Sequence, residues 1–282
     1  MKEKVIAIVG PTASGKTKLS VEIAQKNNGE IISADSRLVY KGFDIAAAKP
    51  TLDEREGIPH YLIDIVEPEY DYSVAEYADM AKIEINNIIK KGKTPIIVGG
   101  TGLYIRVLLE NYDIPRVEAN YDLRSELEEK DTNELLNILK DFDYKSYENL
   151  LNSNKRRIIR AIEIIKTLGK PLSELEREKE PEYNVQWIIP NLESREWLYE
   201  RINKRVDIML TSGLVEETVS LLNKHGRIKN IIDTIGYKEM IEYLDGKVSL
   251  DEAAEKLKQH TRNYAKRQLT WFRKNPNLKI NI

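Results

Sequence analysis

Residues Gly10 to Thr17 read GPTASGKT, which has the spacing G-x-x-x-x-G-K-[ST] of a phosphate-binding loop. The segment follows an apolar, β-branched run at Val5–Val9 and leads into residues with helical spacing, which is the context that this motif requires. Glycine lets successive backbone N–H groups face inward, and the start of the helix adds the positive end of its dipole. The segment therefore predicts an anion cradle rather than a purely structural glycine-rich turn.

The side chains of this loop indicate phosphate chemistry without defining the reaction. Lys16 would reach the terminal phosphate charge, and the Thr17 hydroxyl would ligate a Mg²⁺ ion shared with the phosphates. Kinases that bind ATP, nucleotide hydrolases and transferases with a diphosphate leaving group could all use such a cradle. The predicted diphosphate- or nucleotide-binding residues are Gly10, Pro11, Thr12, Ala13, Ser14, Gly15, Lys16 and Thr17.

Two further segments would open at the same edge of the predicted sheet. Asp35 follows a short apolar run at Ile31 and Ile32, at the carboxyl end of a strand, where ligands collect in open α/β sheets. Its carboxylate could hold Mg²⁺ or accept a proton, although an Asp that caps the next turn fits the spacing equally well. The glycine cluster Gly99–Gly102 follows an apolar run at Pro95–Val98, and its bare pattern also fits a tight strand-to-helix turn.

Strands alternating with helices must position these residues. Further strands are predicted at His60–Ile65 and Pro95–Val98, with a helix from about Ser73 to Lys91 between them. This alternation predicts an α/β fold, with a P-loop NTPase-like parallel sheet flanked by helices. From about Asp122 to Glu180 the pattern is helical only, and a strand signal returns at Val185–Ile189. We therefore expect residues 1–115 to form the first part of the core, 116–180 a small all-helical insertion domain, and 181–282 the rest of the core with a basic C-terminal helix.

Composition narrows the class of protein. The chain has 282 residues, of which 41% are hydrophobic and 32% charged, with a net charge of −2, as expected for a globular protein rather than a disordered or repeat protein. No apolar run approaches the ~18 residues that would span a bilayer, so we expect no membrane association. The absence of cysteine excludes disulfides and thiolate chemistry, and we expect a cytoplasmic protein.

Four separated segments, in order along nearly the whole chain, carry a family resemblance. They are GPTASGKT at Gly10–Thr17, SADSRLVYKGFDIAAAKP at Ser33–Pro50, VGGTGLY at Val98–Tyr104 and AKRQLTWFR at Ala265–Arg273. With these segments the sequence resembles the tRNA dimethylallyltransferases, the IPP transferase family. The resemblance implies that the exocyclic amine of the adenosine adjacent (3′) to the tRNA anticodon attacks dimethylallyl diphosphate and releases diphosphate.

The resemblance also implies roles for individual residues. Asp35 matches the general base that takes the proton from the amine, and Thr101 matches the residue that positions the amine. Arg205 matches an arginine that clamps the diphosphate, for which a guanidinium fork is well suited. With Lys16, these are the expected catalytic residues. Because a stacked base cannot reach such a site, we expect the target nucleotide to be flipped out of the anticodon loop.

A net charge of −2 requires any RNA affinity to come from local basic patches. One candidate lies between Lys155 and Lys170, and another follows the four-residue spacing of Lys258, Arg262 and Lys266. Such stripes are usually solvated helix surface, but the family resemblance favours contact with the anticodon stem-loop. The predicted tRNA-binding residues are Asp35, Ser36, Arg37, Leu38, Thr101, Arg156, Arg157, Ile158, Ile159, Arg160, Gly236, Tyr237, Lys238 and Arg262.

Three other functions fit parts of the pattern. An adenylate dimethylallyltransferase would use the same chemistry on a free nucleotide, and a small-molecule P-loop kinase would use Asp35 to activate a hydroxyl for attack on ATP. A nucleotide-gated RNA-binding module would need no catalysis. The isolated His60, His225 and His260 show no metal-ligand spacing. From the family resemblance we expect the protein to bind tRNA, dimethylallyl diphosphate and Mg²⁺. We also expect it to be a monomer.

Overall fold

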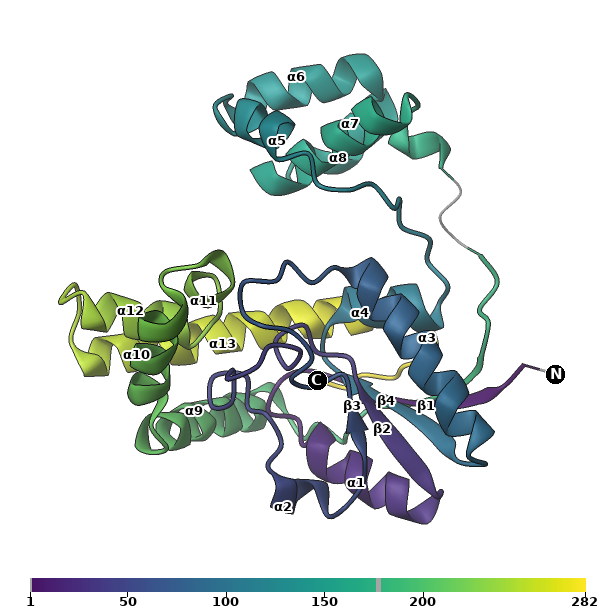
Figure 1. The fold of residues 1–282 in the computed structure, drawn as a ribbon, viewed down its shortest axis with the longest axis vertical. Coiled ribbons are helices and arrows are strands. Elements are labelled where there is room, and N and C mark those ends of the chain that lie inside the picture. The colour runs from purple at the N-terminus through teal and green to yellow at the C-terminus, as the bar shows by residue number, and fades with distance from the viewer. Residues whose placement is uncertain (1, 176–178) are drawn as a thin grey trace. The chain divides into compact units, whose positions relative to one another are not determined.

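A parallel sheet organises the larger of two compact units (Figure 1). The computed structural model of the chain describes residues 2–175 and 179–282. The larger unit contains the residues up to Asn111 and those from Pro181 onward, and the smaller unit is Tyr112–Glu180. Within the described residues the sheet has the order β3-β2-β4-β1-β5, and its strands are β1 (Lys4–Val9), β2 (Gly29–Ser33), β3 (His60–Tyr61), β4 (Thr94–Gly99) and β5 (Asn184–Ile188). The predicted α/β class, with a parallel sheet flanked by helices, is confirmed.

Strand β1 is apolar and buried from Val5 to Val9, as expected for a strand that is covered on both faces. Val5, Ala7 and Val9 pack on the side of helices α3 and α4, whereas Ile6 and Ile8 pack on the side of α1. The helices of this unit are α1 (Lys16–Lys26), α2 (Leu52–Arg55), α3 (Val74–Lys90), α4 (Gly102–Leu109), α9 (Arg195–Thr211), α10 (Leu214–His225), α11 (Lys229–Ile232), α12 (Tyr237–Leu244) and α13 (Leu250–Phe272). None of the helices that the structure describes is long and apolar enough to cross a membrane.

The strand order brings three loops together. Strand β4 lies between β1 and β2, and all three are parallel, so the loops that follow them leave the same edge of the sheet. These loops carry Gly10–Gly15 after β1, Asp35 after β2 and Gly100–Thr101 after β4. The topology therefore assembles the predicted site residues from segments that are far apart in sequence.

Helices α9 and α13 pack beside the first of these loops. Leu198 and Ile202 of α9 share a buried cluster with Ala265 and Leu269 of α13 and with Ala13 of the loop itself. Helix α13 starts with a capping box in which Ser249 and Glu252 satisfy each other's backbone N–H groups. This packing aims polar residues of both helices at the loops.

The predicted strand at His60–Ile65 is wrong in length. The structure extends it only over His60–Tyr61, because Leu62 and Asp64 adopt left-handed backbone conformations with φ of 59° and 56°. Ile65, at the end of the predicted strand, instead bonds to the loop after β2: its N–H donates to the Val39 carbonyl at 2.9 Å.

The smaller unit contains α5 (Tyr121–Glu128), α6 (Thr132–Phe142), α7 (Tyr144–Leu150), α8 (Lys155–Leu168) and a short 3₁₀ helix at Leu172–Glu174. Its core is formed by leucine and isoleucine side chains, including Leu127, Leu135, Leu139, Ile158 and Ile162. Its boundary at Tyr112 lies four residues before the expected position 116. Its helical character matches the sequence pattern.

Candidate active site

The loop between β1 and α1 has the geometry of an anion cradle. Gly15 has φ of 90°, a conformation that favours glycine, and as N-cap it offers no side chain to the free N–H groups at the start of α1. Ala13 adopts φ of 61°, which is strained for a residue with a side chain. The Ser14 hydroxyl is buried without a hydrogen-bond partner in the described structure. A bound anion would satisfy these donors.

Three cationic side chains surround this cradle. Lys16 donates to the Pro11 carbonyl at 2.6 Å, Arg205 donates to the Thr12 hydroxyl at 3.1 Å, and Arg201 donates to the Ala13 carbonyl at 2.8 Å. Burial, and to a lesser extent the Arg205 guanidinium, lower the pKa of Lys16 to about 7, against the opposing effect of Asp35. Burial and Arg201 likewise lower the pKa of Arg205. The cluster is therefore unfavourable without an anion.

Arg201 was not identified from the sequence, although a signal was present. It precedes Arg205 by four residues on α9, so both side chains project from one helical face. Its guanidinium also lies over the Trp197 ring, at 4.8 Å from the ring centroid. The position of this face against the phosphate-binding loop depends on tertiary packing.

Asp35 and Thr101 lie on two loops that are hydrogen-bonded to each other. The Thr101 N–H donates to the Ala34 carbonyl at 3.2 Å, and the Ser36 N–H donates to the Thr101 Oγ1 at 3.1 Å. One carboxylate oxygen of Asp35 accepts the Arg37 N–H at 2.8 Å, so Asp35 does cap its own turn. The same carboxylate acts electrostatically on Lys16 and Arg205. The acid therefore lies close enough to these two cations of the cradle to act on them.

Helix α13 places two polar residues beside these loops. Tyr264 hydrogen-bonds to Thr101, and burial together with the nearby Asp35 carboxylate raises the pKa of its hydroxyl, which stays protonated. Gln268 contacts both the Thr12 N–H and the Gly100 carbonyl. Neither Tyr264 nor Gln268 is among the site residues predicted from the sequence, yet their four-residue spacing beside the buried Ala265 and Leu269 is a usable signal.

The family model described as IPP transferase matches residues 38–275. The chain belongs to the IPP transferase family. It is 49% identical over 285 residues to the tRNA dimethylallyltransferase of Acetivibrio thermocellus, covering 98% of this chain and 90% of the relative. It is 48% identical to that of Anoxybacillus flavithermus, covering 97% and 88% of the two chains. The resemblance carried by the four sequence segments is confirmed.

Solved structures of IPP transferases have the same fold. The full-length tRNA isopentenylpyrophosphate transferase of Bacillus halodurans matches with a TM-score of 0.72 and 44% identity, covering 98% of this chain and 88% of that chain. A eukaryotic dimethylallyltransferase described as acting on tRNA matches with a TM-score of 0.81 and 32% identity, covering 96% and 70%. The P-loop-like core is therefore the fold of this transferase family.

The structure separates the predicted RNA-contacting residues of α8 into two groups. Arg156 and Arg157 are exposed, whereas the side chains of Ile158 and Ile159 are packed in the core of the smaller unit. Arg160 bonds to the fully buried Glu163 and donates to the Val117 carbonyl at 2.8 Å. In this IPP transferase the two isoleucine side chains therefore stabilise the helical unit, and Arg156 and Arg157 are the exposed residues among those predicted in α8.

The tRNA contacts predicted in the C-terminal part of the chain also include both buried and exposed residues. Tyr237 is fully buried, and its hydroxyl donates to Glu217 at 2.6 Å, while Gly236 is also buried and Lys238 is exposed. Arg262 donates to Asn203 at 2.6 Å. Lys258, from the same stripe, forms ion pairs with Asp207 and Glu255 at 3.0 and 2.9 Å. Part of the predicted basic stripe therefore joins α13 to α9.

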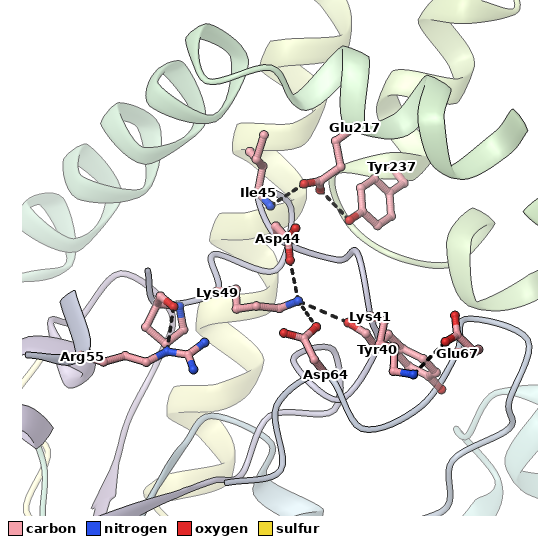
Figure 2. A network of polar contacts seen from close by, with 11 residues as sticks. Tyr40, Lys41, Asp44, Ile45, Lys49, Arg55, Asp64, Glu67, Glu217 and Tyr237 are labelled. Atoms are coloured by element: carbon pink, nitrogen blue, oxygen red, sulfur yellow. Dashed lines mark hydrogen bonds and ion pairs between the residues drawn. The ribbon is translucent and has the colours of Figure 1, made fainter. Parts of the chain in front are cut away.

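A clamp of charged residues holds the segment that follows Asp35–Leu38 (Figure 2). The Lys49 side chain is 7% exposed and pairs with Asp44 and Asp64, and its ammonium also reaches the Tyr40 carbonyl. On the other side, Glu217 of α10 accepts the Ile45 N–H at 2.8 Å. Figure 2 shows Lys49 directed between the two aspartates, with Glu217 between Ile45 and Tyr237. The clamp therefore holds in place the loop that follows Asp35.

Replacing the lysine of this clamp is expected to destabilise the fold. Lys49→Met removes the buried ammonium and leaves the Tyr40 carbonyl and two aspartates without their shared donor. We expect a loss of about 1–3 kcal/mol in the free energy of unfolding, measured by urea denaturation. Lys41→Met, which breaks the exposed pair with Glu67, is the control and should cost under about 1 kcal/mol. Equal effects of the two substitutions would contradict a role for the clamp.

Proposed function

We propose that this chain transfers a dimethylallyl group from dimethylallyl diphosphate to the exocyclic amine of the adenosine 3′ to the tRNA anticodon. The observation that carries the proposal is that the loops of the phosphate cradle and of Asp35 leave the same edge of the sheet, with the Asp35 carboxylate close enough to act on both Lys16 and Arg205. Membership of the IPP transferase family supports the same reaction. One site can thereby hold the departing diphosphate and deprotonate the attacking amine.

The donor half would neutralise the leaving group. Lys16, Arg201 and Arg205 face the loop, and the free N–H groups at the start of α1 complete the set of donors. The described residues contain no group of three His, Cys, Asp or Glu side chains that could hold a metal. A Mg²⁺ ion held by the Thr17 hydroxyl would take its other ligands from diphosphate and water. When bound, it would neutralise charge that develops on the diphosphate oxygens.

The acceptor half would activate the amine. The C–N bond forms as the C–O bond to diphosphate breaks, the diphosphate leaves with the electron pair, and the amine proton passes to the Asp35 carboxylate. Thr101, held between the Ser36 N–H and Tyr264, would orient the amine. The target adenine would have to be flipped out of the anticodon loop to reach Asp35 and Thr101.

The decisive experiment incubates the purified chain with labelled dimethylallyl diphosphate and total tRNA. We expect label in tRNA and release of diphosphate, with no transfer when ATP replaces the allylic donor. Transfer to free AMP with no transfer to an anticodon stem-loop would support an adenylate dimethylallyltransferase instead. Consumption of ATP with phosphorylation of a small molecule would support the kinase alternative.

The exposed arginines of α8 are proposed to bind tRNA phosphates. Arg156→Ala is expected to weaken binding of an anticodon stem-loop and to reduce the slope of log affinity against log salt by about 1, because one phosphate contact is lost. Fluorescence anisotropy at several salt concentrations measures this. Lys145→Ala, on the exposed surface of α7, is the matched control. An unchanged slope in the Arg156 variant would remove this residue from the interface.

We further propose that the chain acts as a cytoplasmic monomer. The cradle, Asp35 and Thr101 all come from a single chain, so the proposed chemistry needs no residue from a second copy. The molar mass of the active species, measured by light scattering during gel filtration, tests this proposal. Activity confined to a dimer would contradict it.

A further inference from the structure

We propose that Gln268 is a positioning residue that fixes the phosphate-binding loop at a set distance from the Thr101 loop. The inference rests on the proposed function, because it assigns Gln268 to the alignment of donor and acceptor. Gln268 is not expected to touch either substrate. It acts through the two loops that it joins.

The Gln268 side chain forms a bridge between these loops. Its Oε1 accepts the Thr12 N–H at 2.8 Å, and its Nε2 donates to the Gly100 carbonyl at 3.0 Å. The residue is 5% exposed, so both bonds are shielded from water. Because one partner can only donate and the other can only accept, the two contacts together fix the orientation of the amide.

The two ends of the bridge are each one step from the proposed chemistry. On the donor side, the Thr12 hydroxyl accepts from Arg205 at 3.1 Å, so Thr12 is held by both Arg205 and Gln268. On the acceptor side, Gly100 immediately precedes Thr101, whose hydroxyl accepts the Ser36 N–H. Gln268 thereby links the diphosphate clamp to the loop that would orient the amine.

The fit around the bridge is tight. A Cβ atom added at Gly100 would lie 2.2 Å from the Gln268 Nε2, a separation that real structures do not show. A Cβ at Gly102 would lie 2.3 Å from the Trp271 ring. Helix α13 therefore approaches the loop after β4 as closely as glycine permits, and the amide has little room to move.

Two variants separate positioning from packing. Gln268→Met keeps the approximate shape but makes neither hydrogen bond. Gln268→Glu can still accept the Thr12 N–H but, when ionised, cannot donate to the Gly100 carbonyl. Protonation of the Glu variant restores a donor, and burial raises the pKa of such a carboxyl group. Leu269→Ala, its buried neighbour on α13, is the control for loosened packing.

The measurements are single-turnover transfer with both substrates prebound, affinity for inorganic pyrophosphate, affinity for an anticodon stem-loop, and melting temperature. For Gln268→Met we expect transfer to fall by ~10²-fold, while both affinities stay within about threefold of wild type. For Gln268→Glu we expect the rate, relative to wild type at each pH, to rise as pH falls from 8.5 to 6. Leu269→Ala should lower the melting temperature without this pH signature.

Other outcomes would overturn the inference. Wild-type transfer rates in Gln268→Met would leave the proposed function intact but remove Gln268 from alignment. Parallel losses of melting temperature, affinity and rate in Gln268→Met and Leu269→Ala, with no pH dependence in Gln268→Glu, would make the residue merely structural. Absence of transfer by the wild-type chain would instead reject the proposed function, and this inference with it.

Discussion

Asp35→Asn is expected to lower the rate of dimethylallyl transfer by about 10²–10⁴-fold while leaving pyrophosphate and anticodon stem-loop affinity nearly unchanged. The amide is close to the carboxylate in shape but is not a base, so it cannot take the proton that the amine loses as the C–N bond forms. Its oxygen can still accept the Arg37 N–H, which Asp35 binds at 2.8 Å. The substitution therefore removes the proposed chemistry and keeps the turn.

Comparison with Asp35→Ala separates the catalytic role from the turn-capping role. If Asp35 only caps the turn, the Asn variant should transfer at the wild-type rate and only the Ala variant should be impaired. If Asp35 is the base, both variants should lose transfer, and the Ala variant should also lose stability because its turn has no acceptor. Single-turnover rates and thermal melts distinguish these outcomes, with Asp53→Asn on the exposed helix α2 as the control.

The local part of the site could be predicted from the sequence because its parts are contiguous. The motif from Gly10 to Thr17 specifies a strand, a turn and a helix start within a few residues, and the structure has that order. Asp35 and Thr101 could be placed at the same sheet edge because parallel strands share a carboxyl edge. Their hydrogen-bonded loops agree with that placement.

The remaining parts depend on contacts between distant segments. Gln268 meets Thr12 across 256 residues, and neither local propensity nor motif spacing encodes that contact. The sequence prediction includes Tyr237, Ile158 and Ile159 among the RNA contacts because it takes whole contiguous segments. Helical periodicity instead buries these side chains and exposes their charged neighbours. The strand beginning at His60 was overestimated because apolar composition does not reveal left-handed backbone conformations.

Lys16→Met is expected to lower transfer by about 10²–10³-fold, as for the loss of one preorganised donor to a developing oxyanion. In the proposed reaction the diphosphate would lie against Lys16, Arg201 and Arg205, so removal of one cation is expected to weaken both its binding and its stabilisation as the leaving group. Lys18→Met, an exposed lysine on the same helix, is the control and should transfer normally. Transfer by the Lys16 variant at the wild-type rate would exclude this lysine from the leaving-group site.

The lowered pKa of Lys16 also predicts how diphosphate binding depends on pH. Without an anion the pKa of Lys16 is about 7, so above that pH much of this side chain is neutral. A bound diphosphate favours the charged form and raises the pKa, so binding takes up a proton between pH 7 and the raised value. Affinity for pyrophosphate should therefore fall as pH rises above 7.

Calorimetric titration in buffers of different ionisation enthalpy measures this proton uptake directly. Pyrophosphate itself titrates in the same range, so the informative quantity is the difference in proton uptake between the wild-type chain and Lys16→Met at each pH. We expect the difference in proton uptake to grow as pH rises through 7 and to be largest between pH 7 and the raised pKa, where this lysine is neutral in the free chain and charged in the complex. Equal proton uptake in the two proteins would mean that Lys16 does not change protonation when the anion binds.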